Sequence, residues 1–324
     1  MPRDCAARWL DAAIVAALCV VAGRTTAALL RFATTAPELP LWDEAKYGLD
    51  GARLAAALRD LDLFRFAALV YDLDVWPPLF PIVESVVFLI AGNGFAVARG
   101  LVAALFLGAV LAAFWAGREI APASPGVAAG AAALVLASPF VQLFAVQAML
   151  ELPGALLYLL ALAVYARFLR TGARRALLAT GLVSAALFFT KYNYALLWLA
   201  PLAASEAWIA CGGPRGVLRR GAALAGRFDW RRPWHVFVAL YLAVLAAIAV
   251  SGGGTLSLAG RELSVTSVGN PLYLLLVLLA ARAAWRPRRW WRRWRSWERG
   301  LAERHRVLLR TVALPAAVWL ALPP

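Results

Sequence analysis

Long apolar runs separated by short polar segments make up most of this sequence. A helix that crosses a lipid bilayer needs about 20 mainly apolar residues, and the runs predict about nine such helices. They lie at roughly 9–31, 95–116, 126–146, 152–169, 175–191, 193–210, 234–251, 270–285 and 307–324. The pattern therefore predicts an all-α, polytopic membrane protein.

A further apolar helix, at about 78–91, is too short to cross a bilayer comfortably. It follows Pro77-Pro78, contains Glu84 and ends at the glycines around Asn93. One stripe of this helix has apolar residues at helical spacing, namely Leu79, Val83, Val86 and Ile90. We expect it to lie along the outer membrane interface.

A second interfacial helix is predicted from about Trp42 to Asp60. Its apolar face is formed by Tyr47, Leu54, Leu58 and Leu61, which suits a helix lying beneath the lipid headgroups. Both interfacial helices belong to a long first loop, at about 32–94.

Composition and charge place the chain in a membrane. Of 324 residues, 63% are hydrophobic and 16% are charged, and the mean hydropathy is +0.72, which is outside the soluble range. The net charge of +15 comes mostly from arginine clusters between apolar runs, as expected of cytoplasmic loops and not of a nucleic-acid surface. If the helix at 78–91 does not cross the membrane, all the basic clusters lie on the same side of the membrane. This predicts a cell-membrane protein with a cytoplasmic N-terminus and an extracytoplasmic loop 32–94.

Acidic residues gather in the predicted outer segments, and two of them are adjacent. Asp43 and Glu44 fall in the first turn of the helix that begins near Trp42. A helix N-terminus favours the ionised carboxylate, which can accept a proton near neutral pH. The alternative is structural: Asp43 is then an N-cap and Glu44 a partner of the helix dipole.

Three charged residues sit at the outer ends of predicted spans: Lys191, Arg99 and Glu151. An ionisable group in so apolar a context is a candidate functional residue. Each also has a structural interpretation, as a side chain reaching the headgroups or as half of an ion pair between helices. Tyr192 is a candidate for contact with a sugar, although aromatic residues are common at membrane interfaces.

The cysteines and histidines indicate no disulfide framework and no metal site. Cys5, Cys19 and Cys211 show no paired spacing, and His235 and His305 are far apart in sequence. The outer carboxylates could hold a divalent metal, but they show no dedicated ligand spacing. The run from Trp285 to Gly300, rich in Trp and Arg, reads as an anchor to anionic lipids at the membrane surface.

Four motifs in order give the chain a resemblance to a known family. They are WDEAKYG, WPPLFPIVESVVFLIAGNGFAVARG, SPFVQLFAVQAMLELPG and FFTKYNYALL. Together they resemble the N-terminal membrane module of the GT-C glycosyltransferases, nearest to the bacterial protein-mannosyltransferase-like and lipid A aminoarabinose-transferase-like groups (families 39 and 83). The resemblance covers about residues 10–210.

The resemblance implies an inverting enzyme that uses a sugar linked to polyprenyl phosphate and an extracytoplasmic glycan, lipid or protein as acceptor. It carries the catalytic acid residue onto Asp43, with Glu44 beside it. The family's arginine, acidic residue and lysine match Arg99, Glu151 and Lys191.

The chain departs from the family at two points. Relatives often carry His, Lys or Glu before the Pro-Pro pair, where this chain has Trp76. In relatives, that residue is expected to contact the donor phosphate or a metal. Asp74 is a candidate to replace this contact, although solvation of the loop explains Asp74 equally well. Relatives also continue through more spans, so we expect this chain to be part of a longer protein.

The chain is predicted to form a single membrane domain, 1–324, because no repeat or linker divides it. Residues 1–210 would be the family-like module and 211–324 additional spans and basic loops. Two other functions stay open: a transporter or flippase for a lipid-linked anion, and a membrane assembly protein without catalysis.

Overall fold

A computed structural model of the chain describes residues 2–35, 43–73, 77–225, 231–251, 254–258, 261–265, 274–275, 278 and 302–321. The chain divides into two compact units, one of Met1–Pro201 with Glu303–Pro324 and one of Leu202–Ala302. Four described helices are long and apolar enough to cross a membrane, or five if one bent pair counts as a span. The four are Ala12–Thr35, Phe95–Ile120, Glu151–Thr171 and Tyr192–Cys211. These helices fit the predicted helical membrane protein, but the described residues do not show nine spans.

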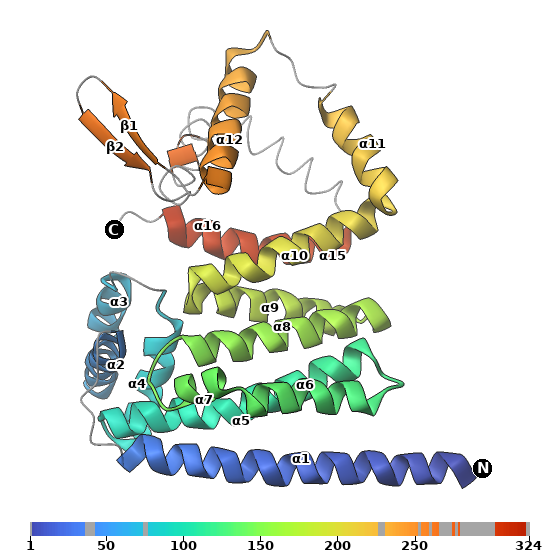
Figure 1. The fold of residues 1–324 in the computed structure, drawn as a ribbon. Helices are drawn as coiled ribbons and strands as arrows, with labels where there is room; N and C mark the ends of the chain where they lie inside the picture. Colours follow the sequence, from blue (N-terminus) through green and yellow to red (C-terminus); the bar gives the residue numbers. More distant parts are fainter. Residues whose placement is uncertain are drawn as a thin grey trace. The chain divides into compact units, whose positions relative to one another are not determined.

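The first unit is a bundle of long helices with a group of short helices at one end (Figure 1). Four long helices pack each against the next, in the order α1 (Pro2–Thr35), α5 (Phe95–Ile120), α8 (Glu151–Thr171) and α9 (Arg174–Thr190). The short helices at one end are α2 (Asp43–Arg59), α3 (Leu63–Tyr71) and α4 (Leu79–Ala91). The unit also contains α6 (Pro125–Ala137), α7 (Pro139–Ala145), the start of α10 (Tyr192–Cys211), α15 (Glu303–Leu308), the π-helical turn η1 (Leu309–Ala313) and α16 (Leu314–Ala321).

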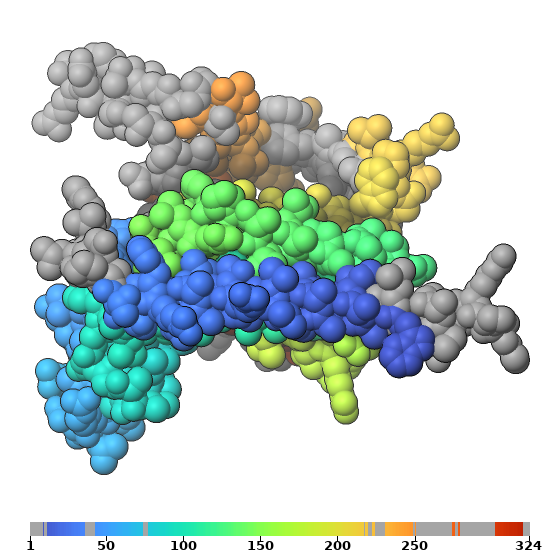
Figure 2. All heavy atoms as spheres, turned by 60° about the horizontal axis from the view of Figure 1, so that its bottom comes forward, coloured from blue at the N-terminus to red at the C-terminus, as the bar shows by residue number. Residues whose placement is uncertain are grey.

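The outward surface of α1 is apolar, as lipid contact requires. Figure 2 shows α1 along one face of the first unit, where Val20, Val21 and Phe32 are exposed. The charged residues of the segment from Ala12 to Thr35 are Arg24 and Arg31, both exposed, and its other polar residues are threonines and Cys19. Exposed apolar side chains on a helix of this length indicate a surface that faces acyl chains.

The predicted span at 126–146 is not one continuous helix, because the chain bends by 60° between α6 and α7. Proline has no N–H and disfavours helical geometry in the residue before it, and Ser138, before Pro139, is extended. The Ser138 Oγ accepts a hydrogen bond from the Val141 N–H at 3.4 Å. Gln142 Nε2 donates to the freed Leu136 carbonyl at 2.7 Å. Side chains at the break therefore bond to the Val141 N–H and the Leu136 carbonyl.

Helix α4 is short, as predicted, and its apolar stripe faces outward. Val86 and Ile90 are 48% and 84% exposed, whereas Phe80, Glu84 and Phe88 on the opposite face are buried. The helix ends at Gly92, whose φ of 87° is in the range that glycine adopts readily. An exposed apolar stripe on a helix of 13 residues fits a helix lying in the interface.

The prediction for the face of α2 is wrong in part. Tyr47 and Leu54 are buried because α2 packs against α4 and not against lipid. The helix ends at Arg59, so Leu61 lies beyond it, 84% exposed and with a positive φ of 55°. The apolar stripe of α2 is thus an internal packing surface.

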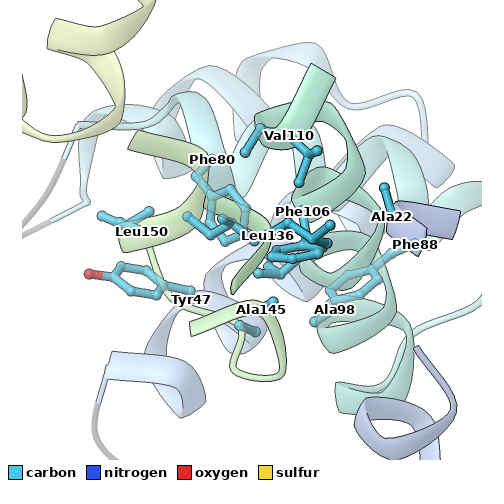
Figure 3. Close-up of a cluster of buried hydrophobic side chains, with 14 of the residues drawn as sticks. Ala22, Tyr47, Phe80, Phe88, Ala98, Phe106, Val110, Leu136, Ala145 and Leu150 are labelled. Atoms are coloured by element: carbon cyan, nitrogen blue, oxygen red, sulfur yellow. The ribbon is translucent and has the colours of Figure 1, made fainter. Parts of the chain in front are cut away.

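A single buried cluster joins the short helices to the bundle. Figure 3 shows the Tyr47 ring near Phe80, with Phe106 of α5 and Leu150 in the same cluster. The Tyr47 and Phe80 rings meet edge to face, with centroids 6.2 Å apart, a favourable aromatic geometry. This packing fixes α2 and α4 on α5.

The opposite end of the bundle is basic and has its own ion-pair group. Glu119 of α5 is buried and lies 2.5 Å from the guanidinium of Arg170 of α8. Trp115 Nε1 donates to the same carboxylate at 3.0 Å. Nearby, Arg174 at the start of α9 pairs with Glu303 at 3.2 Å. At the other end, Glu44 of α2 bonds both to Arg99 near the start of α5 and to Ala148 just before α8. The starts of α5 and α8 thus lie at one end and Glu119 and Arg170 at the other, so the two helices run in the same direction.

The second unit contains the helices α11 (Pro214–Ala225) and α12 (Pro233–Ser251) and a hairpin that the sequence did not predict. Strands β1 (Gly254–Leu258) and β2 (Arg261–Val265) are antiparallel, with Leu256 opposite Leu263. The hairpin is an exception to the all-α prediction. Most of the predicted span 270–285 lies outside the described residues.

A glycine on α2 permits its close approach to α4, which gives the first testable prediction. A Cβ on Gly51 would lie 2.9 Å from the Glu84 Cβ and 3.2 Å from the Phe88 ring. Gly51→Ala should therefore lower the free energy of unfolding by about 1–3 kcal/mol, the usual cost of overpacking, measured by denaturation in detergent. Gly130→Ala is the control, because nothing lies within 4 Å of its added Cβ. A loss no greater than that of the control would contradict the prediction.

Candidate functional site

Glu44 and Arg99 form a buried ion pair between α2 and α5. Arg99 Nε donates to Glu44 Oε1 at 2.7 Å, and a terminal guanidinium nitrogen donates to Oε2 at 2.9 Å. The side chains are only 8% and 6% exposed. The Ala148 backbone N–H also donates to Glu44 Oε1, at 3.0 Å. Paired and charge-assisted bonds of this kind orient both groups strongly.

Lys191 and Glu151 form a second ion pair, between the end of α9 and the start of α8. Lys191 Nζ donates to Glu151 Oε1 at 2.7 Å, and the side chains are 13% and 22% exposed. Glu151 occupies the first turn of α8, where the helix dipole favours a carboxylate. The ring of Tyr194 lies 5.5 Å from Nζ and against Gly154. This pair keeps some access to solvent.

One short segment joins the two ion pairs. Ala148 binds Glu44 through its backbone and Glu151 binds Lys191 through its side chain. The two residues are three apart, so their Cα atoms lie within about 11 Å of each other even if the chain is extended. The segment between α7 and α8 therefore brings four of the predicted site residues into one region: Glu44, Arg99, Glu151 and Lys191.

Asp43 begins α2 next to this region and differs from its neighbour. Its side chain is partly buried, and no hydrogen bond or ion pair joins it to any residue that the structure describes. Since α2 starts at Asp43 itself, its position is the first helical turn. The adjacent carboxylates thus have different surroundings: Glu44 is buried and paired, whereas Asp43 is only partly buried.

The remaining two predicted residues are placed differently. The Tyr192 hydroxyl accepts a hydrogen bond from Trp319 Nε1 at 3.0 Å, and its ring contacts Phe188. It therefore helps to attach α16 to the start of α10. Asp74 lies outside the described residues, as does Trp76 before Pro77.

From the sequence, Glu84 is only an acidic residue within the short apolar helix at 78–91, but the structure makes it part of this region. The residue is 0% exposed, and neither carboxyl oxygen has a hydrogen-bond partner among the residues described. Burial, with the nearby charges of Asp50 and Glu44, raises the pKa of Glu84 to about 8. One signal was available: Glu84 is spaced by four from Phe80 and from Phe88, which places it on the buried face.

A further acidic residue of α2 lies near Glu84 and has its own cation. Asp50 is mostly buried, and its carboxylate lies 3.4 Å from Lys46 Nζ, one helical turn away. In the part of the chain that the structure describes, no three His, Cys, Asp or Glu side chains form a group that could hold a metal ion. The Asp50 carboxylate is thus paired with Lys46, as that of Glu44 is with Arg99.

Comparison of the chain with protein-family models, with curated proteins and with solved structures gives no match. The function is therefore inferred from the sequence motifs and from the chemistry of the residues described above.

Proposed function

We propose that this protein is an integral-membrane glycosyltransferase that moves a sugar from a polyprenyl-phosphate donor to an extracytoplasmic acceptor, with inversion at the anomeric carbon. In this proposal the chain has about nine spans, a cytoplasmic N-terminus, and α2 to α4 on the outer side of a cell membrane. The four sequence motifs and their resemblance to the GT-C module support it.

The single observation that carries the proposal is the arrangement around Ala148–Glu151. Asp43, the first residue of α2, has a partly buried carboxylate. Its neighbour Glu44 is fixed by hydrogen bonds from Arg99 and Ala148. A lysine with partial access, Lys191, belongs to the same region. A base and a cation are the two groups that transfer from a phosphate-linked donor requires.

The proposed reaction breaks one bond and forms one bond at the anomeric carbon. The acceptor oxygen attacks this carbon from the face opposite the phosphate, and Asp43 takes the proton of the acceptor. The bond from carbon to phosphate oxygen breaks, and its electron pair stays on the polyprenyl phosphate that departs. A phosphate is a weakly basic leaving group, so no general acid is needed.

The other residues have supporting roles in this proposal. Two guanidinium nitrogens of Arg99 donate hydrogen bonds to the Glu44 carboxylate. This ion pair positions α2 and, with it, Asp43. Lys191 stabilises the charge that develops on the phosphate, and Glu151 orients Lys191. Tyr192 and Asp74 stay candidates for donor contact, and no step is routed through a metal.

The experiment that tests the function is incubation of the reconstituted protein with a panel of polyprenyl-phosphate sugars and candidate acceptors. The expected result is consumption of at least one donor, with release of free polyprenyl phosphate and a glycosylated product of inverted configuration. Binding of donors without any turnover across the panel, in the presence of glycan, lipid and peptide acceptors, would count against a transferase.

Lys191 gives a second testable prediction, on donor binding. Lys191→Ala should weaken the binding of a polyprenyl-phosphate sugar by about 10- to 100-fold, because a hydrogen bond to a charged group contributes about 1.5–3 kcal/mol. Binding is measured by titration in detergent. Glu151→Gln is the matched control: it removes the ion pair but keeps the lysine, so donor binding should persist. Equal losses in both variants would show that the pair is only structural.

One observation favours a second function, the transport of a lipid-linked anion. Broken helices at membrane depth occur in transporters, and α6 and α7 form one such bent pair. A transporter would move a fluorescent lipid phosphate between leaflets of a vesicle without cleaving it. Movement without cleavage would favour this second function, and cleavage would favour the transferase.

A further inference from the structure

The Glu84 carboxyl lies in the contact between α2 and α4. A Cβ added to Gly51 of α2 would lie 3.1 Å from Glu84 Oε2, so this oxygen is directly against the α2 backbone. The Glu84 side chain is fully buried. A buried carboxylate without a partner is costly, and the raised pKa of Glu84, about 8, favours the neutral carboxyl at pH 7.

The charges that face Glu84 are already matched. From α2 come Glu44 and Asp50, and their cations are Arg99 of α5 and Lys46 of α2. Helix α9, which also packs against α4, has no charged residue from 176 to 190. Its C-terminal Lys191 is bonded to Glu151. An ionised Glu84 would therefore add a third negative charge beside two balanced pairs.

We propose that Glu84 is a positioning residue whose protonated carboxyl keeps α2 closed against α4, and that loss of the proton releases α2. The significance of this release for catalysis rests on the proposed function, because α2 begins with Asp43 and Glu44. The release itself can be measured without any substrate.

The direction of the pH effect follows from proton linkage. The ordinary pKa of a glutamate, 4.5, applies when α2 is detached, and the closed form has a pKa of about 8. The closed form thus binds the proton more tightly. Closure is most favoured below pH 4.5, and the equilibrium constant for opening should rise about tenfold per pH unit up to about pH 8. Above that pH both forms are ionised, and the constant levels off.

The test is amide hydrogen exchange of α2 in the full chain in detergent, from about pH 5 to about pH 9, corrected for the intrinsic exchange rate. In the wild type, the equilibrium constant for opening of α2 should rise about tenfold per pH unit and level off near pH 8. In Glu84→Gln this dependence should be absent. Peptides from α8 are an internal control and should show no such rise.

Asp50→Asn provides a second variant if Glu84→Gln does not fold. The charge of Asp50 raises the pKa of Glu84, so its removal should move the upper end of the transition to lower pH. A wild-type opening constant independent of pH, an unchanged slope in Glu84→Gln, or an unmoved transition in Asp50→Asn would each overturn the proposal. If α2 opens as expected but no donor is consumed at any pH, the positioning role stands and the proposed function fails.

Discussion

Asp43→Asn is expected to reduce sugar transfer by about 10²- to 10⁴-fold, the range over which general-base catalysis contributes to rate. The amide has nearly the shape of the carboxylate but cannot take a proton from an acceptor hydroxyl. No described residue bonds to the Asp43 side chain, so folding and donor binding should be nearly unchanged. The turnover rate at saturating donor and acceptor measures the effect.

A nearby acidic residue provides the control for Asp43. Asp60 is exposed and pairs only loosely with Arg65, at 3.6 Å, so Asp60→Asn should leave the turnover rate at its wild-type value. A turnover rate in Asp43→Asn that matched the wild type would reject the role of base. Transfer would then have to use another carboxylate.

Arg99→Leu should lower the free energy of unfolding by about 3–5 kcal/mol, because it leaves the Glu44 carboxylate buried without its cation. The effect is measured by chemical denaturation in detergent. The double variant Glu44→Gln/Arg99→Leu should recover most of this loss, since the glutamine is neutral and can still accept from the Ala148 N–H. The recovery distinguishes an unpaired charge from simple loss of volume.

The matched control for Arg99 is an exposed pair in the same unit. The Arg65 and Asp60 side chains are 54% and 61% exposed, so Arg65→Leu should change the free energy of unfolding by at most about 1 kcal/mol. If Arg99→Leu lowered the free energy of unfolding by no more than Arg65→Leu does, the buried ion pair would not hold α2 in place.

The sequence predicted the features that depend on local pattern. The helical class, the short α4 and its exposed stripe at Val86 and Ile90 all follow from runs and spacing of apolar residues. The selection of Arg99, Glu151 and Lys191 followed from charges in apolar surroundings, where an isolated charge is costly. Glu44 was selected because it lies beside Asp43 in the first turn of a predicted helix. The structure pairs these four residues as Glu44 with Arg99 and Glu151 with Lys191.

Features that depend on contacts between distant segments were not predictable from the pattern. Spacing cannot say whether Tyr47 and Leu54 face lipid or protein, since both surroundings are apolar. The break at Ser138 had a signal in Pro139, but a proline inside a membrane helix often only bends it. The environment of Glu84 depends on Gly51, 33 residues earlier in the sequence, and the backbone donor at Ala148 leaves no trace in residue type.

The ion pairs at the two ends of α5 restrict how the bundle can move. Glu119 binds Arg170 of α8 at one end, and Arg99 acts through Glu44 on Ala148, just before α8, at the other. Sliding of α5 along α8 by one turn, about 5.4 Å, would rupture both attachments at once. Tilting of the α2–α4 layer disturbs only one. Any gating motion in this unit should therefore be a hinge at the end that carries α2 to α4, with the register of α5 on α8 preserved.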